Sequence, residues 1–267
     1  MIGRAFADIC SRSRSSKDGM AGAYAVLFAI GMHRIDWPIV KRDDCNTNII
    51  FGRDCVKITL RDLDPKDYKK AIQFAIEGMH FHWYMDSKWL LQLYGRYFWY
   101  LEMTRATQVI AAYSGDRFVG VLLAAMKGKA KCHHSFWKSA YVKMFDFLQN
   151  TFEKKGVGIY DRTNQEMFTA DCKDPNPDGE ILFLAADPTQ KERGIGSILL
   201  EELERRERGK QVYLYTDDAC TYQFYERRGF HRAGERRILL QIGEKKTDLR
   251  CFLYSKTLGE CSDGSLG

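Results

Sequence analysis

EILFLAADPTQKERGIGSILLEEL, residues 180–203, runs from a short apolar segment through a polar loop and two glycines into a helical pattern. Because chain-breaking residues bound the apolar segment, it predicts a buried strand. Ile195, Ile198, Leu199 and Leu203 recur at helical spacing and predict the buried face of an amphipathic helix. The stretch therefore predicts a strand, a tight turn and a helix, with the glycines where the helix starts.

The turn around Gly194 and Gly196 has three readings: a Walker-type phosphate loop, a dinucleotide fingerprint, or a turn without a ligand. A Walker loop needs a lysine directly after its last glycine, and a dinucleotide fingerprint needs a third glycine. Ser197 and Leu199 occupy those positions, so both motifs fail. The first N–H groups of a helix have no internal partners and lie at its positive end. An anion site and a plain turn therefore both stay open.

Strand and helix patterns recur along the rest of the chain. Apolar runs predict strands at residues 56–60, a hairpin over 107–128, and strands at 179–188, 212–218, 236–242 and 249–255. Helical spacing predicts helices at residues 64–77, 87–106, 134–155, 194–206 and 219–228. Gly229 is expected to end the last helix in the left-handed conformation, with Phe230 folding back. This order predicts a mixed α/β domain with one central sheet.

Composition narrows the class of protein. The 267 residues carry 41 basic and 35 acidic side chains, a formal charge of +6. This modest excess argues against a nucleic-acid partner and suits a small anionic ligand. Eight cysteines without a C-x-x-C pair or a metal spacing indicate a reducing, cytoplasmic setting and predict no metal. The apolar run at 21–32 is shorter than the ~20 residues of a spanning helix, so we expect no membrane partner.

The ends of the chain are expected to lie outside the folded domain. Residues 1–55 have little periodicity, which predicts an N-terminal extension that is disordered or translated from too early a start. A secretory signal is disfavoured, because the A-x-A triplet precedes the apolar run instead of following it. We expect one folded domain over residues 56–258, a helical insertion within it at 129–177, and a flexible tail at 259–267.

Two motifs give the chain a family resemblance. Residues 180–203, followed by YLYTDDACTYQFYERRGF (213–230), resemble the GNAT superfamily of acyl-CoA-dependent N-acyltransferases. In that family an R/Q-x-x-G-x-G/A turn holds the pyrophosphate of coenzyme A, and Y-x-x-x-G-F marks the following helix. The motifs correspond to residues 191–196, with Lys191 in the first position, and to 225–230. The resemblance implies a mixed, mostly antiparallel sheet that splays at two parallel strands, flanked by helices.

The resemblance also implies an N-acetyltransferase that moves an acetyl group from acetyl-CoA, its co-substrate, to a primary amine by direct attack in a ternary complex. A backbone N–H of residues 184–186 would hold the oxyanion, and Asp218 stands where many members have an asparagine on the pantetheine arm. The implied donor-binding residues are Leu184, Ala185, Ala186, Lys191, Glu192, Arg193, Gly194, Ile195, Gly196, Ser197, Asp218 and Thr221.

Tyr225 and Glu180 are the candidate catalytic residues. Tyr225 would protonate the departing thiolate, and the motif spacing favours this role over that of a packed aromatic. Glu180 would take the amine proton, and a plain glutamate at a strand edge is an equally open reading. Cys220 has no histidine near it in a recognisable pattern, so a small helix residue is favoured over a ping-pong nucleophile.

Several readings stay open. The aromatic residues of 80–84, with Trp89, Tyr97 and Trp99, belong to the core or wall the acceptor site. The adjacent His133 and His134 lack a third metal ligand, which favours loop histidines. A non-catalytic acyl-CoA sensor is the alternative function, and a nucleotide-phosphate binding protein is a third. The acceptor, a small molecule or a protein amine, is not readable from the sequence, and a homodimer is left open.

Overall fold

The structure is a computed structural model that describes residues 47–49, 58–83, 87–132, 138–145, 159–172, 174–187, 189, 194–242 and 245–259. Three expected donor-binding residues, Lys191, Glu192 and Arg193, lie outside this range. The His133–His134 pair and most of the expected N-terminal extension lie outside it as well. No helix within the described ranges is both long enough and apolar enough to span a bilayer.

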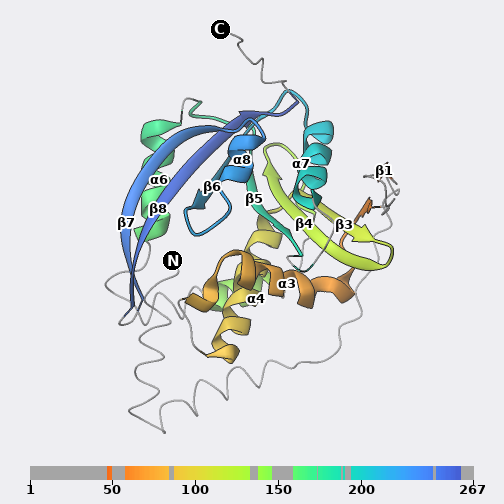
Figure 1. Ribbon diagram of the computed structural model, residues 1–267, viewed down its shortest axis with the longest axis horizontal. Coiled ribbons are helices and arrows are strands. Elements are labelled where there is room, and N and C mark those ends of the chain that lie inside the picture. Colours follow the sequence, from red (N-terminus) through yellow and green to blue (C-terminus); the bar gives the residue numbers. More distant parts are fainter. Residues whose placement is uncertain are drawn as a thin grey trace.

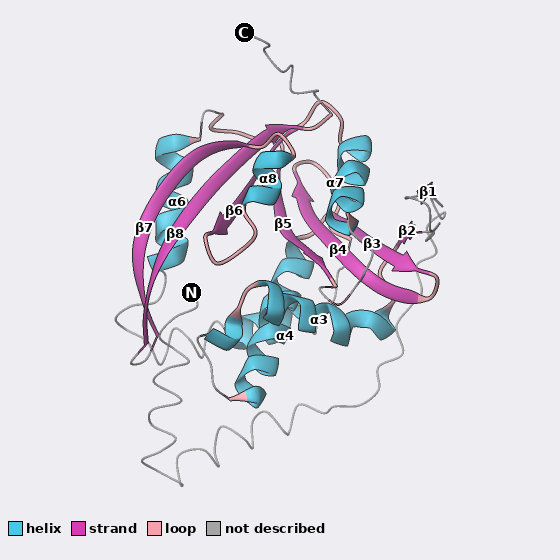
Figure 2. Ribbon diagram, viewed as in Figure 1, coloured by secondary structure: helices cyan, strands magenta, loops and turns pink. Residues whose placement is uncertain are grey.

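One mixed sheet forms the centre of the described part of the chain (Figures 1 and 2). Its strand order is β1-β2-β3-β4-β5-β6-β8-β7. The strands are β1 (Thr47–Ile49), β2 (Ile58–Arg61), β3 (Gln108–Ser114), β4 (Arg117–Met126), β5 (Gly179–Ala186), β6 (Gln211–Asp217), β7 (His231–Ile242) and β8 (Lys245–Thr257). Neighbours are antiparallel except for β5 and β6, which are parallel. The predicted fold class is confirmed.

Helices cover both faces of the sheet. They are the 3₁₀ turns η1 (Pro65–Asp67) and η2 (Phe81–Trp83), and the helices α3 (Tyr68–Gly78), α4 (Lys88–Arg105), α6 (Ile159–Asp171), α7 (Ile195–Arg206) and α8 (Gln223–Arg227). Along β3, Ala111 and Tyr113 pack with α3 and α4, whereas Ile110 and Ala112 pack with α7. Side chains alternate across a strand, so each face of β3 and β4 is buried under different helices. Because both faces are buried, these strands appear in the sequence as continuous apolar runs.

The structure differs from the expected elements at several places. Residues 138–145 are helical as predicted, but the helix α6 was missed, since the sequence prediction ended at residue 155. Its buried side chains are Thr163, Asn164 and Met167, so it has no apolar stripe that reveals a helix. The helix predicted at 219–228 shortens to α8, because the Asp217 carboxylate binds the next backbone N–H groups in a turn. β1 adds an edge strand inside the segment expected to be an extension.

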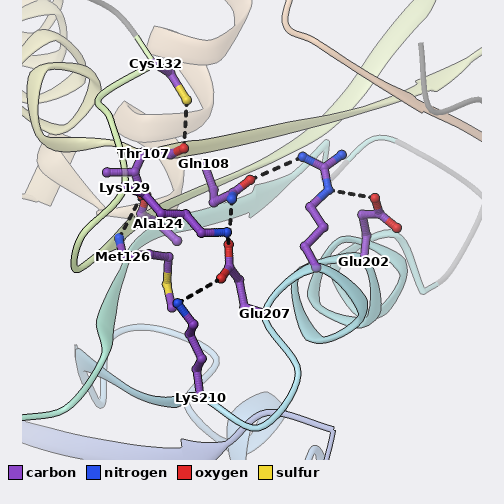
Figure 3. A network of polar contacts seen from close by, with 10 residues as sticks. Thr107, Gln108, Ala124, Met126, Lys129, Cys132, Glu202, Glu207 and Lys210 are labelled. Atoms are coloured by element: carbon purple, nitrogen blue, oxygen red, sulfur yellow. Dashed lines mark hydrogen bonds and ion pairs between the residues drawn. The ribbon is translucent and has the colours of Figure 1, made fainter. Parts of the chain in front are cut away.

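A buried carboxylate fixes α7 to the sheet (Figure 3). Glu207 follows α7, and its side chain is only 1% exposed. It accepts hydrogen bonds from Lys129, after β4, and from Gln108 Nε2 of β3 at 2.6 Å. Lys210 adds an ion pair at 3.6 Å. The C-terminal end of α7 is thereby tied to the β3–β4 hairpin, which sets where its N-terminal end lies.

Candidate active site

The parallel strands β5 and β6 separate soon after they meet. They pair at Gly179 with Val212 and at Glu180 with Tyr213. Beyond these residues β5 continues to pair with β4, and β6 continues to pair with β8. A cleft of about 1280 Å³ lies between the separated strands, and both strands line it. The predicted splay is confirmed, and we call this space the β5–β6 cleft.

Backbone donors face the β5–β6 cleft from β5. The N–H of Asp187 binds the carbonyl of Val119 on β4 at 2.8 Å. Because successive N–H groups of a strand point to opposite sides, the N–H groups of Leu184 and Ala186 point away from β4. Both residues line the cleft. These two groups are therefore available to a carbonyl oxygen that enters between the strands.

The N-terminus of α7 also opens onto the cleft. Gly194 stands before the helix with φ of 96°, a conformation that costs side-chain-bearing residues energy. The first internal hydrogen bond runs from the Ile198 N–H to the Gly194 carbonyl at 3.0 Å. The preceding N–H groups, those of residues 195–197, have no acceptor within the helix itself. Gly194, Ile195, Gly196 and Ser197 line the cleft, so these donors form a positive end at its wall.

Close packing holds this helix end in place. A Cβ on Gly120 of β4 would stand 2.7 Å from Ile195 and 3.1 Å from the carbonyl oxygen of Ala185. The missing side chain thus allows α7, β4 and β5 to meet directly. On the other side, Arg228 donates a hydrogen bond to the Ser197 hydroxyl, and Arg227 lines the same cleft. The wall at α7 and α8 is therefore rich in positive charge and N–H donors.

Tyr225 reaches the cleft from α8. Its ring contacts those of Phe224 and Phe230, with centroids 5.3 Å and 5.6 Å away. Gly229 has φ of 77°, and the Phe230 N–H binds the Tyr225 carbonyl at 3.1 Å, so the predicted end of this helix is confirmed. Burial raises the pKa of Tyr225 well above its usual 10. The hydroxyl therefore keeps its proton at neutral pH and can serve as a donor.

Glu180 lies where the two strands part, within a cluster of charged groups. Its carboxylate accepts hydrogen bonds from Arg105 of α4 and from the Tyr213 hydroxyl, the latter at 3.2 Å. Arg105 also donates to Glu102 at 3.0 Å. Burial raises the pKa of Glu102 to about 7, and nearby Glu180 adds to the rise while Arg105 opposes it. Two carboxyl groups thus share one guanidinium beside the cleft.

Sequence reasoning missed Glu102 and Arg105. Both line the cleft with Glu180. Glu102 follows the buried Phe98 by one helical turn, so it is a charged residue on the buried face of α4. That position was the signal available in the sequence, because charged groups are almost never fully buried without a partner.

The remaining expected residues lie in the turn after β6, and only some of them line the cleft. Cys220 and Thr221 line the cleft, whereas Asp218 is not among its lining residues. The Asp218 carboxylate instead binds Arg250 on β8, at 2.9 Å to Nε. Burial raises the pKa of the Cys220 thiol to about 12, and the charge of Asp217 adds to it. The thiol is therefore protonated at neutral pH, which argues against a nucleophilic role.

Asp187 closes the end of β5. Burial alone would raise its pKa, but hydrogen bonds from Lys70 and Thr189 hold it well below the usual range. The Lys70 ammonium lies 2.8 Å away, and Arg117 adds a second contact at 3.2 Å. This carboxylate links β5 to α3 and β4. Within the described residues, no group of three or more His, Cys, Asp or Glu side chains is arranged to hold a metal ion.

The β5–β6 cleft lies between splayed parallel strands, and its wall at α7 and α8 carries both the glycine-started helix and Tyr225. The family model described as acetyltransferase (GNAT) family matches residues 75–230. The chain belongs to this family. The predicted resemblance is thereby confirmed, and with it an acyltransferase class. No curated protein sequence matches the chain significantly.

Solved structures resemble this GNAT chain at low sequence identity. A histone acetyltransferase HPA2 and related acetyltransferase from Corynebacterium glutamicum has 15% identity and a TM-score of 0.49, covering 77% of this chain and 98% of its own. PaiA N-acetyltransferase from Thermoplasma acidophilum, in complex with coenzyme A, has 15% identity and a TM-score of 0.43, covering 75% and 98%. Arabidopsis thaliana Naa50, with a bisubstrate analogue, has 16% identity and a TM-score of 0.37, covering 74% and 97%.

Proposed function

We propose that this GNAT protein transfers an acetyl group from acetyl-CoA to a primary amine by direct attack in a ternary complex. The observation that carries the proposal is the separation of β5 from β6 beyond Glu180 and Tyr213. The resulting cleft is lined by N–H donors, an acid candidate and a base candidate. These are the groups that acyl transfer from a thioester requires.

The described wall fits the anionic half of coenzyme A. A pyrophosphate suits the N–H groups at the start of α7, which have no acceptor within the helix and lie at the positive end of its dipole. The positive φ of Gly194 and the absence of a side chain on Gly196 leave the backbone open to a bulky anion. Arg228, bound to Ser197, adds charge at the same end. Lys191, Glu192, Arg193 and Asp218 stay predictions for this site.

The transfer can be written with these groups. The neutral amine nitrogen attacks the thioester carbon, and a C–N bond forms while the carbonyl oxygen takes up negative charge. The N–H groups of Leu184 and Ala186 hold that oxygen, a contact worth about 3 kcal/mol in comparable sites. The C–S bond then breaks with its electron pair going to sulfur, and Tyr225 protonates the thiolate. Glu180 takes the proton that the amine nitrogen gives up.

Glu102 supports the base from the far side of Arg105. A carboxyl group with a pKa of about 7 changes its charge in the neutral range. When Glu102 loses its proton, Arg105 is shared by two charges, and its hold on Glu180 weakens. We therefore assign Glu102 as a positioning residue, and Glu180 as the group that touches the amine.

The alternative is a non-catalytic acyl-CoA sensor. Tyr225 and Glu180 lie on the same cleft as the α7 N-terminus, and this arrangement favours the enzyme. A cytoplasmic location and the absence of nucleic-acid, membrane and metal partners stay predictions from composition, and a homodimer stays open.

Steady-state kinetics test the proposal. With acetyl-CoA and an amine both varied, direct transfer gives intersecting double-reciprocal plots of thiol release. Parallel plots would indicate a covalent acyl-enzyme and contradict direct transfer. Calorimetry is the companion measurement, in which coenzyme A is expected to bind and ATP to bind far more weakly. Equal binding of the two would favour a nucleotide-phosphate protein.

A further inference from the structure

The helix α6 presents a polar face to the β5–β6 cleft. Asp161, Asn164, Gln165 and Phe168, spaced three and four residues apart, line the cleft together. The helix is fixed to the neighbouring sheet at both ends. The Tyr160 hydroxyl donates to Asp217 at 3.3 Å, and the Phe168 ring lies 4.8 Å from that of Tyr213 between centroids. This wall is therefore held against β6, the strand next to the one that carries Glu180.

Asn164 has a buried acceptor without a donor. Its side chain is 8% exposed, and its Oδ1 atom has no hydrogen-bond partner among the residues that the structure describes. A buried oxygen without a donor costs free energy, and native proteins retain few of them. Because Asn164 also lines the cleft, the missing donor is expected to come from a ligand.

The charge at this end of the cleft is negative. Glu102, Asp161 and Glu180 line it, and we call these three carboxyl groups the acidic end. Asp161 lies near enough to Glu102 for its charge to help raise that pKa. Arg105 is the guanidinium bound to both Glu102 and Glu180. The positive groups Arg227 and Arg228 lie instead on the wall near α7. The two ends of the cleft therefore suit ligands of opposite charge.

Resting on the acetyl transfer proposed above, we infer that the acceptor is an aliphatic diamine or longer polyamine. Its reacting amine lies at Glu180, and its far ammonium donates to Asn164 Oδ1 beside the Asp161 carboxylate. The tilted rings of Phe168 and Tyr213 border the methylene chain between the two nitrogens. A monoamine of the same length would leave Asn164 without its donor.

The test compares cadaverine with pentylamine, which has the same carbon chain and one amine fewer. We expect the wild type to favour cadaverine by about tenfold in kcat/KM, since a hydrogen bond to an ammonium is lost with pentylamine. Asn164→Leu keeps the side-chain size, removes the acceptor, and is expected to abolish this preference. Asn164→Asp keeps an acceptor and is expected to retain it. The KM for acetyl-CoA should stay unchanged in both variants.

Thr163→Val is the matched control, because Thr163 is buried on the same helix but does not line the cleft. It should leave the cadaverine preference intact. An equal cadaverine-to-pentylamine ratio in wild type and Asn164→Leu would overturn the inference.

Calorimetry on the CoA-saturated protein separates this inference from the proposed function. Cadaverine that binds more tightly than pentylamine, with the difference lost in Asn164→Leu, supports the subsite whether or not acetyl transfer occurs. Tight cadaverine binding without transfer would refute the enzyme alone. Equal binding of the two amines would refute the subsite alone.

Discussion

Glu180 and Tyr213 are the last paired residues of β5 and β6, and the Tyr213 hydroxyl also donates a hydrogen bond to the Glu180 carboxylate at 3.2 Å. The point where the parallel strands part is therefore also the point where the candidate base is held. In the proposed reaction, the amine meets this carboxylate at the end of the cleft nearest the closed part of the sheet. Backbone pairing thus fixes both the opening and the candidate base.

Tyr225→Phe should keep coenzyme A binding and lose turnover. Removing the proton donor is expected to lower kcat about a hundredfold, because general acid catalysis contributes on that order. The raised pKa of Tyr225 means that the hydroxyl stays protonated over the neutral range. Tyr222→Phe is the matched control. Tyr222 lies three residues before Tyr225, packs on Phe252 of β8 and does not line the cleft. An unchanged kcat in Tyr225→Phe would refute the assignment.

Glu102→Gln should make the protein more stable at alkaline pH relative to the wild type. Folding raises the pKa of Glu102 to about 7 from an ordinary 4.5. Such a group contributes stability below pH 4.5 and loses that contribution as the pH rises through 7, by about 3 kcal/mol. Urea unfolding at pH 4, 6 and 8 measures this difference. Glu166→Gln, at an exposed position on α6, is the matched control variant.

Gly194→Ala should weaken coenzyme A binding and also lower the free energy of unfolding. An alanine at φ of 96° costs about 1–2 kcal/mol of unfolding free energy and shifts the N–H groups that face the cleft. We expect about tenfold weaker binding by calorimetry. Gly209, with φ of 80° in the turn before β6, offers the control. Gly209→Ala should lose similar stability yet bind coenzyme A normally, and equal loss of binding in both variants would argue against an anion site at α7.

Cys220→Ala should keep kcat within about twofold, because a thiol with a pKa of about 12 supplies almost no thiolate at neutral pH. Intact-mass measurement after incubation with acetyl-CoA alone is the second readout, with no acetyl adduct expected. An acetyl adduct on Cys220, together with loss of activity in Cys220→Ala, would show instead that transfer proceeds through an acyl-enzyme.

The sheet, the start of α7 and the end of α8 could be predicted from the sequence because their signals are local. Apolar runs mark β3 to β6, and Gly194 with the Y-x-x-x-G-F motif marks the ends of α7 and α8. In both cases the physical cause lies within a few neighbouring residues. The backbone conformations of Gly194 and Gly229 depend on the missing Cβ alone.

The surroundings of Glu180 and the helix α6 could not be predicted, because their signals are long-range or weak. Glu102 and Arg105 meet Glu180 across 75 or more positions of sequence, and only the packing of α4 on β5 brings them together. The helix α6 buries Thr163 and Asn164, so its hydrophobic pattern is too weak to reveal it. The ion pair of Asp218 with Arg250, on the neighbouring strand β8, joins residues 32 positions apart in the sequence and has no local signal either.

Transfer of an isotope-labelled acetyl group tests the central claim most directly. Acetyl-CoA labelled in its acetyl carbon is incubated with the protein and cadaverine, and the label is followed by NMR and mass spectrometry. The account predicts that the label appears on the amine nitrogen of cadaverine with release of free coenzyme A thiol, and that Tyr225→Phe slows this about a hundredfold. Label that stays on coenzyme A, in a protein that binds it, would contradict the account.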